Sequence, residues 1–191
     1  MSTAVAQRIY TPEDLLALPD SVSYELVDGE LAERNMGFES SFVGGILFRL
    51  LSNHCAANGL GIVLPADASY QCFPDAPNKV RRPDVSYIAS GRLPAGVLPR
   101  GHCPIAPDLA AECVSPNDSF SEVETKVNEY LAAGVRLVWV IDPPTRVVLV
   151  SRPDGTVARL SDGDELTGED VVPGFRCRVG ELFPSPPGTG A

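Results

Sequence analysis

The chain has 191 residues, 44% of them hydrophobic and 21% charged, which is ordinary for a globular protein and excludes a fibrous or wholly disordered chain. Its apolar stretches fall far short of the roughly 20 residues that cross a bilayer, so we expect no membrane helix. The formal net charge of −10 argues against a broad basic surface for nucleic acid, although a local group such as Lys79, Arg81 and Arg82 can still line a site.

The first part of the chain predicts two helices and a hairpin. Thr11 followed by proline fits the start of a short helix that ends by Pro19. Residues 24–31 predict two short strands around the dipeptide Asp28-Gly29, because this pair suits a tight hairpin turn. Apolar residues at helical spacing predict an amphipathic helix over about 40–57.

The remainder of the chain predicts strands with one helix between them. We expect the helix at about 121–133, where Ser121 and Glu124 fit a capping box and Gly134 follows the end. The predicted strands are 62–73, 80–89, 109–114, 137–141, 147–151 and 156–160. These elements predict a single α/β domain over residues 1–183, followed by a disordered tail over 184–191.

Two acidic residues lie where a strand is expected. Glu112 interrupts an apolar run, where an unpaired carboxylate would cost several kcal/mol or raise its own pKa. Asp84 follows a proline at the start of another strand and can approach Glu112 if the two strands are antiparallel neighbours. Asp108 is a rival, but four strand residues place it roughly 13 Å from Glu112, too far to share an ion. A solvated Asp84 is the alternative for that residue.

Lys126 lies on the helix that follows the Glu112 strand. One alternative is a surface pair with Glu122, four residues earlier. The other is that its ammonium reaches the carboxylates, where it could orient a water molecule or offset charge on a phosphoryl transition state.

Several motifs together resemble one protein family. They are Tyr24-Glu-Leu-Val-Asp-Gly-Glu-Leu, Arg82-Pro-Asp-Val, Asp108-Leu-Ala-Ala-Glu-Cys-Val-Ser-Pro, Lys126 with Glu129-Tyr130, Ala133-Gly134-Val135 and Trp139-Val-Ile-Asp-Pro. In order and spacing, over roughly residues 10–183, this set resembles the Uma-two type of restriction-endonuclease-like proteins, within the PD-(D/E)XK nuclease superfamily. The resemblance implies a restriction-endonuclease-like α/β core, in which helices flank a central mixed sheet.

The resemblance also implies a site. Asp84 and Glu112 correspond to metal-binding acids for Mg²⁺ or Mn²⁺, and the backbone carbonyl of Cys113 could add a ligand. The usual motif lysine is replaced by valine at position 114, so the resemblance implies that Lys126 substitutes for it. Glu25 corresponds to an acid of the first hairpin that can approach the same cluster, or else is a surface residue.

These observations leave three functional hypotheses. The first is a cytoplasmic Mg²⁺-dependent endonuclease that acts on nucleic acid, with DNA as its expected substrate and a homodimer as a possible assembly. The second is a catalytically inactive binding or regulatory module on the same fold, which the charge of −10 favours. The third is a zinc hydrolase, which would need His54, His102 and cysteines to converge.

Overall fold

A six-stranded mixed sheet forms the centre of the computed structural model, which describes residues 8–35, 37–93 and 96–184. Its strands, in spatial order, are β3 (Gly61–Pro65), β4 (Val85–Ala89), β5 (Leu109–Cys113), β6 (Leu137–Asp142), β7 (Val147–Ser151) and β8 (Val157–Ser161). Strands β5 and β6 are parallel, and the other neighbouring pairs are antiparallel. A parallel pair needs a long connection, and here a helix supplies it.

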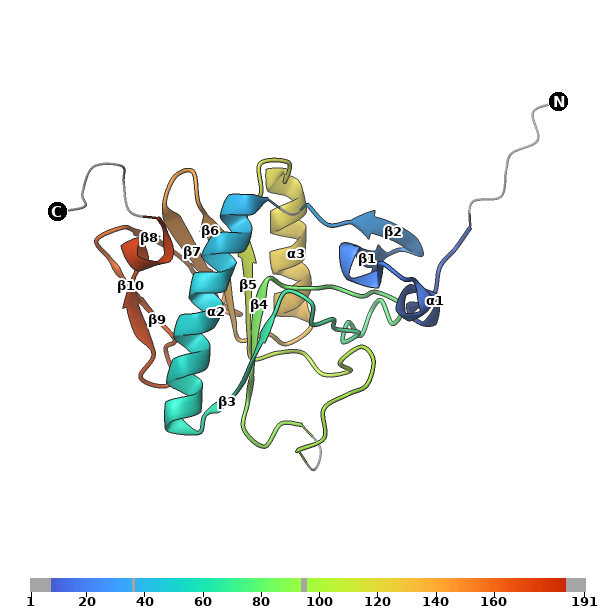
Figure 1. Cartoon of the computed structure of the whole chain (residues 1–191), viewed down its shortest axis with the longest axis horizontal. Coiled ribbons are helices and arrows are strands. Elements are labelled where there is room, and N and C mark those ends of the chain that lie inside the picture. Colours follow the sequence, from blue (N-terminus) through green and yellow to red (C-terminus); the bar gives the residue numbers. More distant parts are fainter. Residues whose placement is uncertain (1–7, 36, 94–95, 185–191) are drawn as a thin grey trace.

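Two helices cover the two faces of this sheet (Figure 1). Helix α2 (Phe38–Asn58) packs Val43, Leu47 and Leu51 against one face. Helix α3 (Phe120–Ala132), which connects β5 to β6, packs Val127 and Tyr130 against the other. Side chains alternate between the faces along a strand, so β5, which is buried throughout, and β6, which is buried except at Asp142, contribute to both cores. The predicted α/β fold is confirmed.

A hairpin packs beside α3, together with α1 (Pro12–Ala17) and a 3₁₀ turn, η1 (Ser21–Ser23). Its strands are β1 (Tyr24–Val27) and β2 (Glu30–Glu33), joined by the predicted turn. Asp28 and Gly29 have φ angles of 52° and 82°, as a two-residue turn of this kind requires. A backbone bridge between Leu26 and Val80 ties the hairpin to the segment before β4.

The C-terminal part contains elements that the sequence patterns did not predict. Strands β9 (Glu165–Thr167) and β10 (Arg176–Arg178) form a two-stranded ribbon, followed by η3 (Val179–Leu182). Phe175, just before β10, packs against the chain's single tryptophan, Trp139, at a ring separation of 5.9 Å. These elements therefore extend the core on the α2 side of the sheet.

Three predicted boundaries are wrong. The strand expected over 62–73 ends at Pro65, and the strand expected over 80–89 begins only at Val85. Between them, Tyr70 makes isolated bridges to Arg81 and Cys103, so these segments pair without forming a continuous ladder. The cap of α3 is Ser119 with Glu122, two residues before the predicted pair, because Ser119 accepts from the Glu122 amide.

The helix expected over 40–57 spans Phe38–Asn58 and ends at Gly59 in the left-handed conformation, which glycine adopts without strain. The predicted tail over 184–191 lies outside the described residues except for Pro184. Among the described helices, none is long and apolar enough to cross a bilayer.

Candidate active site

Glu112 lies inside β5 on the face that α3 covers, and it is 6% exposed. Both of its carboxylate oxygens have partners on α3. The Tyr130 hydroxyl donates to Oε1 at 2.7 Å, and the Lys126 ammonium lies 3.2 Å from Oε2. The α3 crossover thus compensates the acid that interrupts this apolar strand, because positions 126 and 130 lie on one side of the helix.

Asp84 lies one residue before β4 and meets the end of β5. The register pairs Val85 with Ala111, so its continuation places Asp84 opposite Glu112. The Cys113 amide donates to Asp84 Oδ2 at 2.8 Å, and Arg34 Nη2 lies 3.3 Å from Oδ1. The expected approach of Asp84 to the Glu112 strand is therefore present in the structure.

Glu25 is buried in β1, and its carboxylate lies against Lys126, the lysine that also contacts Glu112. It accepts from the Arg82 amide at 2.7 Å through Oε1 and from Arg81 Nη1 at 2.9 Å through Oε2. Lys126 Nζ lies 3.4 Å from Oε2 as well. Glu25 is therefore not a surface residue. Lys126 links this acid of the hairpin to Glu112 of β5.

These contacts belong to a chain of alternating charges, which we call the ion-pair ladder. It runs through Lys79, Glu129, Arg81, Glu25, Lys126 and Glu112 in that order. Each interior member contacts an opposite charge on both sides. The ladder fixes the hairpin, the segment before β4 and α3 relative to β5, which positions the candidate site.

The pKa values of the site's carboxyl groups are shifted in different directions. Burial raises the pKa of Glu112 to about 7; Asp84 and Glu25 add to the rise, whereas Lys126 and Tyr130 oppose it. Burial also raises the pKa of Asp84, against the Cys113 amide and Arg34. Burial also raises the pKa of Glu25, but the nearby charges of Lys126 and Arg81 lower it by more, so this pKa lies below its ordinary value.

Lys126 stays charged in this environment. Burial by itself lowers its pKa, but Glu112 and Glu25 raise it above the ordinary value. Because Glu25 is the ionised partner, Lys126 keeps its charge even when Glu112 holds a proton. Burial thus raises the pKa of both Asp84 and Glu112, and a divalent cation bound beside them would favour the ionised form of each.

The rival residues lie elsewhere. Glu122 does not pair with Lys126 as in the surface alternative, because its carboxylate accepts from the Ser119 amide at 2.8 Å. Asp108 accepts from the Ala89 amide at 2.8 Å and lies 3.1 Å from Arg92. It is therefore a structural residue at the opposite end of β5.

The side chains available as metal ligands suit Mg²⁺ better than zinc. Within the described residues, no group of three or more His, Cys, Asp or Glu side chains is placed to hold a metal ion. His54 and His102 each contact a backbone carbonyl instead, of Pro173 and Pro12. The zinc hypothesis is therefore wrong for this part of the chain. Two carboxylates do fit Mg²⁺, which keeps several waters and uses few protein ligands.

A cavity of about 240 Å³ opens above the ladder, between the hairpin and α3. Its inner part is lined by the buried Glu25 and Arg81, the largely buried Arg34 and the half-buried Lys126. Its outer lining includes the exposed acids Glu33 and Glu122 and the half-buried Asp118. A second cavity of about 200 Å³, lined by residues of α2, reaches Asp84 from the other side. The inner part of the first cavity can receive an anion such as a phosphate group, whereas its acidic rim disfavours one.

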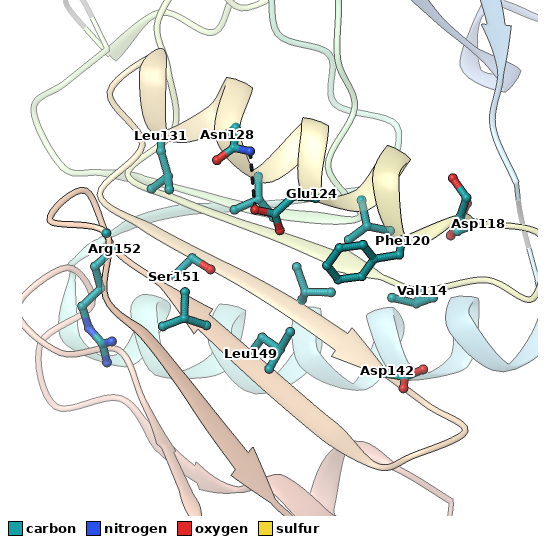
Figure 2. A pocket seen from close by; sticks show the side chains of 16 residues that line it. Val114, Asp118, Phe120, Glu124, Asn128, Leu131, Asp142, Leu149, Ser151 and Arg152 are labelled. Atoms are coloured by element: carbon teal, nitrogen blue, oxygen red, sulfur yellow. Dashed lines mark hydrogen bonds between the residues drawn. The ribbon is translucent and has the colours of Figure 1, made fainter.

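A larger groove of about 400 Å³ lies on the far side of α3 and has a different character (Figure 2). Phe120 and Leu131 of α3 and Leu149 of β7 give it an apolar lining. Its one cationic side chain, Arg152, forms an ion pair with Glu169. This groove is therefore poorly suited to bind phosphate, and none of the four predicted side chains lines it.

Sequence reasoning missed three contributors. Tyr130 is part of a motif but carries no predicted role, although a tyrosine at a buried position signals a hydroxyl that needs a partner. Arg81 was recognised as part of a basic group, but it is 6% exposed and lies inside the ladder. Arg34 carried no sequence signal, because only the fold brings it to Asp84.

Comparisons with known proteins agree with this architecture. Residues 12–180 match the family model Uma2, described as "Putative restriction endonuclease". A solved structure of a putative nuclease belonging to DUF820, from Anabaena variabilis ATCC 29413, superposes with a TM-score of 0.77 at 20% identity. The match covers 91% of this chain and 97% of that one, and at this identity it shows a shared fold. No curated protein matches the chain.

Proposed function

The chain belongs to the Uma2 family of restriction-endonuclease-like proteins, and from this premise we propose that it is a Mg²⁺- or Mn²⁺-dependent endonuclease that hydrolyses phosphodiester bonds in DNA. One observation carries the proposal. Lys126 Nζ lies within 3.4 Å of carboxylates from both β1 and β5, beside the end of β4 where Asp84 meets the β5 backbone. Side chains far apart in sequence thus meet around one lysine, with Glu25 and Lys126 lining the cavity beside the hairpin and Asp84 lining the cavity beside α2.

In this proposal Asp84 and Glu112 hold the metal, and the Cys113 carbonyl is a further candidate ligand. A divalent ion at this place would polarise the phosphate and make a bound water more acidic. Lys126 orients the attacking water and offsets negative charge on the phosphorus as the new bond forms. Glu25 keeps Lys126 charged and aimed inward, and Tyr130 fixes the Glu112 carboxylate.

The reaction is a hydrolysis. The oxygen of one water molecule bonds to phosphorus while the bond from phosphorus to one ester oxygen breaks. The water gives up a proton, and the departing sugar oxygen takes one up, so the products are a phosphate monoester and a hydroxyl. Because a duplex has two strands, we also propose that the active form is a homodimer with two sites.

The test is cleavage of plasmid and oligonucleotide DNA with Mg²⁺, with Mn²⁺ and with a chelator. Asp84→Asn and Lys126→Met are expected to reduce metal-dependent cutting by at least about a hundredfold, as loss of a ligand or an electrostatic stabiliser does. Lys79→Met is the matched control, because Lys79 is the other lysine of the chain and stands at the end of the ion-pair ladder farthest from Glu112, where it pairs with Glu129.

Two outcomes would decide against the proposal. Cutting that survives both substitutions would place the reaction elsewhere in the molecule. DNA binding without cutting, under every metal condition, would instead favour the inactive binding module, which the net charge and the absence of a three-ligand metal group among the described residues also favour.

A further inference from the structure

Arg34 occupies an oxygen that a metal ion would need. It follows β2, its side chain is 6% exposed, and its Nη1 donates to the Val22 carbonyl at 3.1 Å. Its Nη2 lies 3.3 Å from Asp84 Oδ1, while Asp84 Oδ2 is held by the Cys113 amide. Both oxygens of this proposed metal ligand thus have protein partners, and Arg34 is the partner that can move, since the other belongs to a strand backbone.

The Arg34 contact with Asp84 is a weak form of the arginine–carboxylate pair. A strong pair is bidentate, with two parallel N–H bonds of about 2.8 Å. Here one nitrogen makes one long contact, and the guanidinium also lines the cavity above the ladder. Arg34 therefore has donor capacity facing the space in which a phosphate group would lie.

The charges of the site are balanced without metal. Positive and negative side chains alternate along the ion-pair ladder, and Arg34 forms an ion pair with Asp84. A divalent cation placed here has no unpaired carboxylate of the ladder or of Asp84 to receive it, and it comes close to Arg34 and Lys126. Two positive charges a few ångströms apart in a partly buried site repel strongly unless an anion lies between them.

We propose that Arg34 is an exchangeable counter-ion, which leaves Asp84 when the metal binds and then contacts a non-bridging oxygen of the substrate phosphodiester. This inference rests on the proposed function. It makes metal and phosphodiester binding cooperative, because each supplies the charge that the other needs. The acidic rim of the cavity, which repels a phosphate that arrives without a metal, acts in the same direction.

The experiment measures Mn²⁺ binding to the full chain by electron paramagnetic resonance of the free ion, alone and with a dinucleotide that has one phosphodiester. We expect the dinucleotide to tighten Mn²⁺ binding to the wild type. Arg34→Gln is expected to tighten binding of Mn²⁺ alone about fivefold, which corresponds to about 1 kcal/mol from one lost competing pair. The same variant loses most of the enhancement by the dinucleotide.

Two further variants make the result specific. Arg34→Lys keeps the positive charge and is expected to bind Mn²⁺ alone as the wild type does. Arg92→Gln removes a similar pair with Asp108 at the other end of β5 and is expected to change neither quantity. Thermal unfolding of each variant checks that it is folded.

The outcomes separate this inference from the proposed function. Mn²⁺ binding by the wild type that Arg34→Gln weakens or leaves unchanged would overturn the role of Arg34 and leave the nuclease proposal standing. A wild type that binds no Mn²⁺, with or without the dinucleotide, would overturn the metal site itself and the role of Arg34 with it.

Discussion

At the scale of single residues, the site depends on how one lysine is shared between acids. Glu25 holds Lys126 from the hairpin, so Glu112 can gain or lose a proton without leaving the lysine unpaired. Glu112 faces Lys126, Tyr130, Asp84 and Glu25, and only the first two favour its ionised form. Its protonation should therefore be visible in the stability of the metal-free protein.

Glu112→Gln is expected to reduce the pH dependence of stability in the presence of a chelator. Burial raises the pKa of Glu112 from 4.5 to about 7 in the folded protein, so this group stabilises the fold below pH 4.5 and that contribution is lost as the pH rises through about 7. The wild type should lose on the order of 2 kcal/mol from this source by about pH 8, and Gln should not. Thermal unfolding from about pH 5 to about pH 8 measures both; parallel profiles would contradict the assignment.

Tyr130→Phe is expected to move the acid limb of the pH–rate profile to higher pH and to reduce cutting about tenfold. The change removes the hydroxyl that donates to Glu112 at 2.7 Å, and this hydroxyl lowers the pKa of the acid. Tyr87→Phe is the matched control, because its hydroxyl is bonded to the Leu60 carbonyl instead. An unchanged acid limb in Tyr130→Phe would show that the Tyr130 hydroxyl does not control the protonation of the group that limits cutting at low pH.

At the scale of elements, the β1–β2 hairpin is the least expected part of the site. It contributes Glu25 from inside β1 and Arg34 just past β2, so both depend on the turn between the strands. A change at the turn should therefore reach the site without touching any of its residues.

Gly29→Ala is expected to destabilise the protein by about 1–2 kcal/mol and to lower Mn²⁺-dependent cutting as the hairpin loosens. Gly29 has a φ angle of 82°, and a Cβ there would lie 2.7 Å from an Ile9 methyl group. Gly155→Ala is a matched control, because Gly155 has a φ of 83° in the turn between β7 and β8 with open space around it. Equal losses of cutting in both variants would show that the effect is one of global stability.

How much of this could be predicted from sequence also differs by element. Turn and helix-end chemistry is local, which is why the Asp28-Gly29 turn and the glycine after α3, Gly134, were predicted. Strand and helix placement singled out Glu112, Asp84 and Lys126, and the resemblance implied their roles at a metal site. In the structure Lys126 contacts Glu112, and Asp84 meets the end of the Glu112 strand. The segments around Tyr70 and Arg81 pair through isolated β-bridges to distant parts of the chain. The residue pattern within these segments does not indicate where continuous strand pairing ends.

Arg34 and the β9–β10 ribbon were missed for a related reason. The role of Arg34 depends on the distance from Arg34 to Asp84, fifty positions along the chain, which no local pattern contains. The ribbon strands have three residues each, too short for an alternating pattern to be distinguished from a loop.

At the scale of the whole molecule, charge sets the conditions for function. The net charge is −10, and the cations nearest the site are engaged in ion pairs. The long-range field of the protein therefore repels DNA rather than steering it toward the cavity.

DNA binding is expected to require a divalent metal. In fluorescence anisotropy with a labelled duplex, the Lys126→Met variant should show little binding in chelator at about 150 mM salt and at least about tenfold tighter binding with Mg²⁺, because the metal supplies the missing positive charge. Tight binding in chelator with a steep salt dependence would instead reveal a basic surface that acts without metal.

The single tryptophan also makes the molecule convenient to observe. Trp139 is fully buried beside Phe175 on the α2 side of the sheet, and Glu112 projects from the α3 side. Its indole N–H has no hydrogen-bond partner in the described structure. Its emission should therefore lie at short wavelength and shift to longer wavelength only when the core opens to water. Metal added to the folded protein should leave this emission unchanged, so that a single optical signal separates unfolding from ligand binding.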